Sequence, residues 1–184
     1  MRIAYILFDS VTMLDFIGMY DPISRLKSMK FLPDLEWDIC TFSGNIVDSF
    51  GLEIAATKSG NDLGSYDAVI VPGGFGTRTL VKDEDFIDWL RSAGPVPWKV
   101  SVCSGSLLLG AAGFLEGRKA TTNLLEAETL QQFCKEVCSE RVVEDNGVVT
   151  GGAVSAAIDV GLYMCNKWVG PDAEAVIRSR MNYH

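Results

Sequence analysis

Cys103 stands in the sequence where a short apolar segment, VPWKVSV, gives way to the small residues of SGSLLLGAAG. This pattern predicts a strand, a tight turn and a helix, and in open α/β sheets such turns lie at the carboxyl edge, where ligands bind. A cysteine there would be exposed, next to the positive end of a helix and beside backbone N–H groups that can hold an anion. We expect Cys103 to be a nucleophile with a thiol pKa below the usual value of about 8.5. The competing interpretation is a buried cysteine that behaves as a small apolar side chain.

A second turn, rich in glycine, follows another predicted strand. The segment VIVPGGFGT ends that strand at Pro72, Gly73 and Gly74. Glycines allow backbone N–H groups to approach a ligand closely. Because parallel strands end at the same edge of a sheet, we expect this turn and Cys103 to lie near each other. Two ordinary tight turns would give the same pattern.

The base for a cysteine nucleophile is harder to identify, because the one histidine, His184, is the last residue of the sequence. Three carboxylates follow the first predicted strand, namely Asp9, Asp15 and Asp21. Asp15 lies between two large apolar residues, a setting that raises a carboxyl pKa toward neutrality and suits the group for proton transfer. We therefore select Asp15, although a carboxylate at a helix start or in solvent would also fit the pattern.

Four short apolar segments predict the strands that position these residues. They are continuous rather than alternating, as is typical of parallel strands covered on both faces, and helix-length segments separate most of them. The four segments are 3–8, 37–44, 67–74 and 98–105. The pattern predicts an α/β fold, a doubly wound parallel sheet with helices on both faces, as one domain over residues 1–184.

Helices and small hairpins are expected in the intervals between the strands. Apolar residues at helical spacing predict helices at 83–94, 123–138, 153–168 and 170–181. Inserted hairpins are expected at 46–56 and at 141–151, the second around an Asn146-Gly147 turn. Asn123, with Glu126 three residues later, indicates a helix start of the capping-box type. Asp159, inside an apolar helix, is expected to be a buried and paired carboxylate.

Composition restricts the classes of function. The net charge of −8 opposes binding to nucleic acid, whose phosphates recruit clustered basic residues. The apolar segment at the start is too short to span a membrane, and we expect a soluble, cytoplasmic protein. Five cysteines at irregular spacing predict reduced thiols. Cys134 and Cys138 are assigned to core packing rather than to a metal site, because a zinc site needs four ligands and no histidine is near.

Three motifs carry a resemblance that extends over nearly the whole chain. They are LDFIG at 14–18, PGG at 72–74 and VCSGS at 102–106, continued by LLLGAAGFLEGRKATT and VVTGGAVSAAIDVGL. Together they resemble the ThiJ/PfpI superfamily and, within it, the branch of isocyanide (isonitrile) hydratases. The resemblance implies a flavodoxin-like domain of the class I glutamine amidotransferase type, assembled as a homodimer and working without a cofactor or metal.

The resemblance also implies a reaction and a set of site residues. The reaction is the hydration of a small isocyanide to an N-substituted formamide, through a thioimidate on Cys103 with Asp15 moving the protons. The expected binding residues are Gly73, Gly74, Ser104 and Ile17. Ile17 stands where the branch commonly has threonine, and it is expected to make the pocket wall more apolar.

Other activities of the same superfamily are weighed against hydration. Asn123 stands where related amidotransferases and proteases have a histidine, which argues against an amidase or a protease. A glyoxalase or deglycase acting on carbonyl adducts would use the same cysteine and carboxylate. A noncatalytic redox sensor would use a reactive cysteine without turnover.

Overall fold

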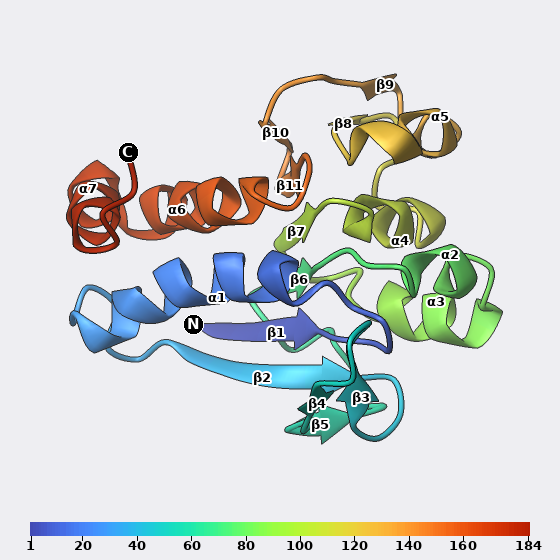
Figure 1. The fold of residues 1–184 in the computed structure, drawn as a ribbon, viewed down its shortest axis with the longest axis horizontal. Coiled ribbons are helices and arrows are strands. Elements are labelled where there is room, and N and C mark those ends of the chain that lie inside the picture. The colour runs from blue at the N-terminus through green and yellow to red at the C-terminus, as the bar shows by residue number, and fades with distance from the viewer.

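In the computed structural model of residues 1–184, seven strands form one sheet in the order β10-β11-β7-β6-β1-β2-β5 (Figure 1). The strands are β1 (Arg2–Ile6), β2 (Glu36–Thr41), β5 (Lys58–Ser59), β6 (Ala68–Val71), β7 (Trp98–Val102), β10 (Val142–Asp145) and β11 (Val148–Gly151). Neighbouring strands are parallel except for β10 and β11. The central strands β1, β6 and β7 are buried over almost their full length, which explains their continuous apolar sequences.

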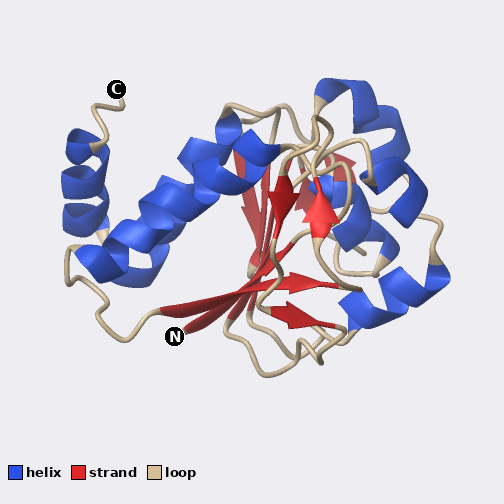
Figure 2. Ribbon diagram, turned by 60° about the horizontal axis from the view of Figure 1, so that its bottom comes forward, coloured by secondary structure: helices blue, strands red, loops and turns tan.

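Two groups of helices cover the two faces of the sheet, as Figure 2 shows. The first group packs together as α1 (Met13–Ser28), α6 (Ala156–Val169) and α7 (Pro171–Arg180). The second group packs together as α2 (Thr77–Leu80), α3 (Glu84–Arg91) and α4 (Gly105–Ala111). This arrangement is the doubly wound, flavodoxin-like α/β fold expected from the sequence.

Glycines allow α1 and α6 to approach each other closely. A Cβ atom on Gly18 would lie 2.6 Å from the Cβ of Ala157, and one on Gly161 would lie 2.4 Å from the Cγ of Pro22. Both distances are far below van der Waals contact, so a larger residue at either position requires the helices to shift. This contact fixes α1, and with it the Asp15 carboxyl in its first turn, against the rest of the fold.

Both predicted hairpins are present. β3 (Ile46–Val47) pairs antiparallel with β4 (Glu53–Ile54), and β10 pairs with β11. Asn146 and Gly147 have φ angles of 51° and 81°, the left-handed values that a two-residue turn of this kind requires. β11 then pairs in parallel with β7, the strand that leads to Cys103.

The prediction of one helix over 123–138 is wrong. The segment instead contains the 3-10 helix η1 (Leu124–Glu126), the single turn α5 (Ala127–Leu130) and the strand β9 (Glu136–Val137), which pairs with β8 (Lys119–Ala120). Leu124 and Leu125 are 83% and 84% exposed rather than part of a buried stripe. The pairing of β9 with β8 turns the chain back after α5, so the helical spacing does not continue.

The start of this segment was predicted in part. Asn123 caps the helical turn, since its Oδ1 accepts a hydrogen bond from the Leu125 amide at 3.0 Å. Glu126 does not complete a capping box, because its carboxylate binds Arg78 instead. The broken helix therefore leaves the Glu126 carboxylate available for a contact across the fold.

Predictions for two cysteines and one carboxylate are also corrected in part. Cys134 packs against the core as expected, but Cys138 is only half-buried and is not a core residue. Asp159 is paired as expected, with the Arg141 guanidinium and the Tyr183 hydroxyl, but its side chain is partly exposed. Cys138 is half-buried because it directly follows β9 rather than ending the helix that the sequence predicted. Asp159 lies near the surface, where its charge is partly solvated.

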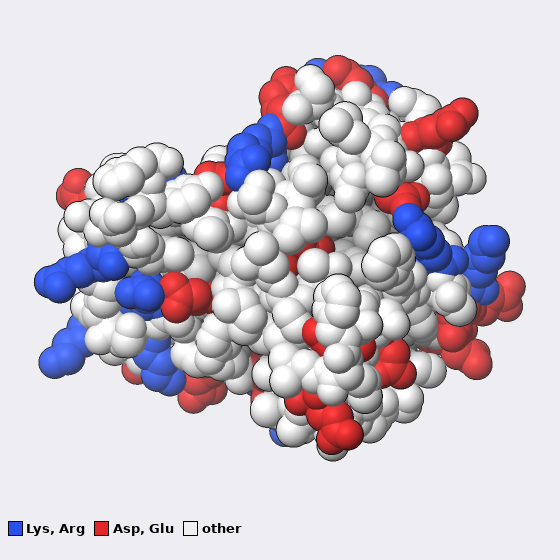
Figure 3. All heavy atoms as spheres, in the orientation of Figure 1, with Lys and Arg blue, Asp and Glu red and all other residues white.

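No helix combines the length and the apolar character needed to cross a membrane. On the face of the molecule in Figure 3, basic side chains are scattered among acidic ones and form no continuous patch.

Candidate active site

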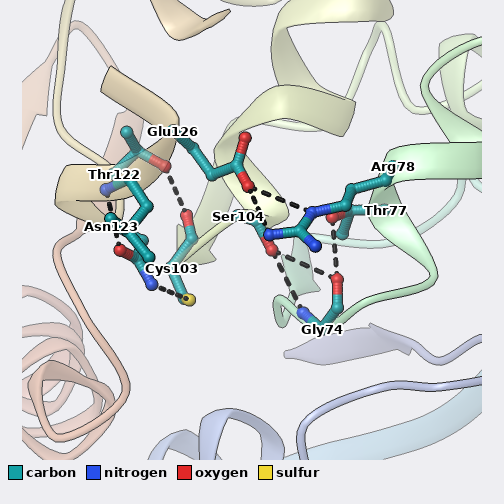
Figure 4. Close-up of polar contacts among 9 residues, drawn as sticks. Gly74, Thr77, Arg78, Cys103, Ser104, Thr122, Asn123 and Glu126 are labelled. Carbon is teal, nitrogen blue, oxygen red and sulfur yellow. Dashed lines mark hydrogen bonds and ion pairs between the residues drawn. The ribbon is translucent and has the colours of Figure 1, made fainter. Parts of the chain in front are cut away.

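Cys103 occupies a sharp turn between strand β7 and helix α4, with a φ angle of 55°. Left-handed backbone is strained for a residue other than glycine, and it persists only where the surroundings hold it. The Cys103 amide donates to the carbonyls of Gly151 and Gly152, at 3.0 and 2.7 Å. Its carbonyl accepts from the Ser106 hydroxyl at 3.1 Å. The same carbonyl accepts from the Thr122 hydroxyl at 2.9 Å (Figure 4). Four hydrogen bonds thus fix the strained turn that presents the thiol.

The glycine turn after β6 lies against the same site, as expected from the sequence. The Gly73 amide donates to the Asp15 carboxylate at 3.0 Å, and the Gly74 amide donates to the Ser104 hydroxyl at 3.1 Å. A Cβ atom on Gly73 would lie 2.7 Å from the Ser104 nitrogen and 2.8 Å from Oδ2 of Asp15. Both amides already have an acceptor, so in this structure they hold the side chains of the site rather than standing open to a ligand.

Asp15 is fully buried, and burial raises the pKa of its carboxyl to about 6. The Gly73 amide and the neighbouring Cys103 thiol lower this pKa in part. The second carboxyl oxygen, Oδ1, has no hydrogen-bond partner. A carboxyl group with a pKa near neutrality and a free oxygen beside a thiol is suited to accept and return a proton.

The expectation of a low thiol pKa at Cys103 is not met. Burial raises the pKa of the Cys103 thiol above its ordinary value, and the negative charge of Asp15 raises it further. The side-chain amide of Asn123, and the amide and hydroxyl of Ser104, act in the opposite direction. The sequence argument considered the helix end but not the buried carboxylate beside the sulfur. The thiol therefore needs a base, and Asp15 is adjacent to it.

A cleft of about 180 Å³ opens at Cys103. It is lined by Thr12, Gly74, Phe75, Arg78, Cys103, Ser104, Asn123, Leu125, Glu126 and Val154. This volume is below the roughly 300–1,000 Å³ of a typical ligand pocket, so the cleft suits a small organic molecule. Asp15 does not line the cleft, so a molecule bound there meets Cys103 directly while the carboxyl stays buried beside the sulfur.

Ile17 does not belong to this cleft. Its side chain is 42% exposed on α1, and it is absent from the lining residues. Successive residues of an α-helix point about 100° apart, so Asp15 and Ile17, two positions apart, lie on nearly opposite sides of α1. Asp15 therefore faces the fold while Ile17 faces away from it. The apolar parts of the cleft wall come instead from Phe75, Leu125 and Val154.

Four polar residues of the cleft, Thr12, Arg78, Asn123 and Glu126, were not predicted as site residues. The Asn123 side-chain amide donates to the Cys103 sulfur at 3.5 Å. Arg78 forms an ion pair with Glu126, in which Nε and Nη2 both donate to Oε1, at 3.2 and 3.1 Å (Figure 4). The sequence marked Asn123 as a helix cap and as the residue in place of a histidine of related enzymes, and it marked Glu126 only as part of a capping box. It contained no signal for Arg78, whose partner is distant in the sequence.

Neither a metal site nor a histidine is built into this region. No group of three or more His, Cys, Asp and Glu side chains has a metal-binding arrangement. His184 is not among the residues that line the cleft. The groups available for chemistry at the cleft are thus a thiol, a buried carboxyl, hydroxyls, an amide and one ion pair.

The fold and the site define a class of protein, the flavodoxin-like α/β proteins with a cysteine on a strained turn between a strand and a helix. The chain belongs to the DJ-1/PfpI family, whose sequence signature matches residues 1–167. It is 34% identical to the isonitrile hydratase of Pseudomonas putida over 185 aligned residues, covering 100% of this chain and 78% of that protein.

Solved structures agree with the family assignment. A THiJ/PfpI family protein from Pseudomonas syringae superposes with a TM-score of 0.88 at 27% identity, covering 99% of this chain and 74% of that one. DJ-1beta from Drosophila melanogaster superposes with a TM-score of 0.84 at 18% identity, covering 100% of this chain and 98% of that one. At that identity the second likeness concerns the fold alone.

Proposed function

We propose that this protein hydrates isocyanides to N-substituted formamides, with Cys103 as the nucleophile and Asp15 as the proton carrier. The observation that carries the proposal is the buried carboxyl of Asp15 beside the Cys103 thiol, which opens on a cleft sized for a small molecule. The similarity to an isonitrile hydratase over the full chain supports the same reaction.

The first half of the reaction adds the thiol across the isocyanide carbon. Asp15 accepts the proton of the Cys103 thiol, and the thiolate attacks the terminal carbon of R–N≡C, forming a C–S bond. Asp15 then returns the proton to the same carbon, which gives the thioimidate R–N=CH–S–Cys103. No group leaves in this half, so one carboxyl group handles the single proton involved.

The second half consumes water and releases the enzyme. Water adds to the thioimidate carbon as the nitrogen is protonated, giving R–NH–CH(OH)–S–Cys103. Collapse of this adduct breaks the C–S bond, expels the thiolate and leaves the formamide R–NH–CHO. The hydroxyl proton returns to Cys103 through Asp15. The Asn123 amide and the Ser104 amide and hydroxyl, which favour the charged sulfur, stabilise the thiolate in both halves.

An assay with purified protein tests the proposal. n-Butyl isocyanide and an aryl isocyanide are supplied, and the formamides are measured by chromatography and mass spectrometry. We expect turnover that Cys103→Ala abolishes. Cys134→Ser, at a half-buried cysteine that does not line the cleft, should retain it. Wild-type protein that makes no formamide, or Cys103→Ala protein with more than a few per cent of the wild-type rate, would contradict the proposal.

The same assay separates hydration from its alternatives. Conversion of a carbonyl adduct or of glyoxal without formamide production would support the glyoxalase or deglycase interpretation. Oxidation of Cys103 without turnover of either substrate would support a redox sensor.

We propose that the protein acts in the cytoplasm as a homodimer. In the β3–β4 hairpin, Phe50 is 93% exposed and Leu52 is 54% exposed, which favours contact with a second copy. Light scattering on wild-type protein and on Phe50→Glu tests the assembly, and a monomeric wild type would contradict it.

A further inference from the structure

Arg78 is the only basic side chain among the residues that line the cleft. Its guanidinium lies over the Phe75 ring, 5.2 Å from the ring centre, and 57% of its side chain is exposed. Two of its N–H groups are directed at the same oxygen of Glu126. A guanidinium has five N–H donors in a planar fork, so three N–H groups of Arg78 do not contact Glu126. The pair also lacks the two parallel hydrogen bonds to two oxygens that a bidentate contact would have.

Glu126 is the more fixed member of the pair. Its side chain is 13% exposed, and its helix η1 is capped by Asn123, the residue that also contacts the Cys103 sulfur. An ion pair with one exposed partner contributes little to stability, so folding alone gives little reason for it. The pair instead places a positive group, with unused donors, in the same small cleft as the nucleophile (Figure 4).

An anionic substrate would need such a group. The net charge of the chain is −8, the Glu126 carboxylate lines the cleft, and the buried Asp15 carboxyl lies beside its nucleophile. A carboxylate entering beside them would be repelled unless a cation bound it. A substrate carboxylate has two oxygens and could form two parallel hydrogen bonds with the Arg78 guanidinium. The Glu126 carboxylate contacts that guanidinium with only one oxygen.

We infer that Arg78 determines substrate charge, and that the isocyanides taken by this cleft are isocyano carboxylates. The inference rests on the proposed function and specifies its substrate class. Such a substrate places its carboxylate on Arg78 and its isocyanide carbon at Cys103. Hydration of an α-isocyano carboxylate adds one water to the terminal carbon and gives an N-formyl amino acid. In the simplest substrates of this class the two groups are attached to one carbon atom.

The first test compares two substrates that differ in charge, isocyanoacetate and methyl isocyanoacetate. The measured quantity is the ratio of their kcat/KM values, anionic over neutral. Arg78→Met keeps the length of the side chain and removes the charge, and it is expected to lower this ratio about tenfold or more, the effect of a charged hydrogen bond. Arg91→Met is the control, since Arg91 is also about half exposed and paired, with Asp88, but lies outside the cleft.

The second test does not depend on hydration. Iodoacetate and iodoacetamide both alkylate Cys103, where the sulfur forms a bond to carbon and iodide leaves, but only iodoacetate is charged. The rates are measured by mass spectrometry of the Cys103 peptide. We expect Arg78→Met to lower the ratio of the iodoacetate rate to the iodoacetamide rate, and Arg91→Met to leave it at the wild-type value. Glu126→Gln removes the competing carboxylate and is expected to raise the ratio.

The outcomes are distinguishable. If Arg78→Met slows both members of each pair equally, Arg78 only shapes the cleft and the inference is overturned. A fall of the alkylation ratio in both Arg78→Met and Glu126→Gln would also overturn it, because Arg78 would then act only as part of the ion pair. If the alkylation ratio responds as expected but the wild type hydrates neither isocyanide, charge selection at the cleft stands and the proposed function fails.

Discussion

The Asp15 carboxyl is fully buried beside the Cys103 thiol, which lines the cleft, and each group shifts the pKa of the other. The negative charge of Asp15 raises the pKa of the thiol, and the thiol lowers the pKa of the carboxyl in part. The two groups therefore share protons as a coupled pair rather than titrating independently. A coupled pair of this kind allows one carboxyl to serve both as the base for the thiol and as the acid for the bound carbon.

The first prediction concerns removal of the proton carrier. Asp15→Asn keeps the size of the side chain and an oxygen that can accept from the Gly73 amide, but it removes the titrating proton. Turnover of isocyanide should fall by about 100-fold or more, the usual scale of general acid–base catalysis. Mass spectrometry of the variant mixed with isocyanide should show whether Cys103 is free or carries a stalled thioimidate. Normal turnover by Asp15→Asn would exclude this carboxyl from the mechanism, and Asp9→Asn serves as the comparison.

The second prediction concerns the pH dependence of catalysis. Asp15 must be ionised to accept the thiol proton, and its pKa is raised to about 6. We therefore expect kcat/KM to fall to about half its plateau value at a pH of about 6, with the plateau reached roughly one pH unit higher. The acid limb should be absent from the residual activity of Asp15→Asn. An acid limb near pH 4 in the wild type, the ordinary range for a carboxyl group, would contradict the assignment.

The third prediction links the same carboxyl to stability. The pKa of Asp15 is higher in the folded chain than its ordinary value of 3.8, so the folded state binds the proton more tightly than the unfolded state does. Its contribution to the free energy of unfolding is therefore greatest below about pH 4 and decreases as the pH rises toward 6. Above pH 6 the buried charge costs on the order of 3 kcal/mol.

Asp15→Asn removes that charge, so the variant should be more stable than the wild type at pH 7.5, and this advantage should shrink as the pH is lowered to 4. Urea unfolding at both pH values measures the difference. A variant less stable than the wild type at pH 7.5 would mean that the Gly73 contact outweighs the buried charge, contrary to this prediction.

Elements whose structure depends on residues close together in the chain were predictable from the sequence. Continuous apolar segments gave the central strands, the Asn146-Gly147 turn gave its hairpin, and the small residues after Cys103 gave the strained turn. In each case the residues that decide the structure are neighbours in the chain. The segment 123–138 was not predictable in the same way, because a pairing of β9 with β8 overrides its helical spacing.

The candidate site was predictable only as far as its motifs extend. Asp15, Cys103 and the glycine turn each stand in a recognisable local pattern, and the sheet brings them together. Arg78 and its partner Glu126 lie in no such pattern, since their contact depends on how α2 and η1 face each other. The sign of the Cys103 pKa shift was also out of reach, because it depends on a balance between burial, one carboxylate and three opposing contacts.

The last prediction concerns Gly73, which lies in contact with both the Asp15 carboxyl and the turn that carries Cys103. A Cβ atom there would lie 2.7 Å from the backbone nitrogen of Ser104 and 2.8 Å from the Asp15 carboxylate, and real Cβ atoms essentially never come so close to other atoms. Gly73→Ala must therefore separate α1 from the turn that carries Cys103, which moves the carboxyl away from the sulfur. We expect a loss of turnover of up to about 100-fold, the size of loss that a misplacement of catalytic groups by about 1 Å can cause. The pH at which Cys103 is half alkylated should also fall, because the carboxylate that raises its thiol pKa has moved away.

Gly94→Ala is the matched control, because a Cβ atom at Gly94 would lie 3.3 Å from its nearest neighbour, the Arg91 carbonyl oxygen. If Gly73→Ala retains wild-type turnover and the wild-type pH dependence of alkylation, the close packing of Asp15, Gly73 and Ser104 is not what sets the reactivity of Cys103.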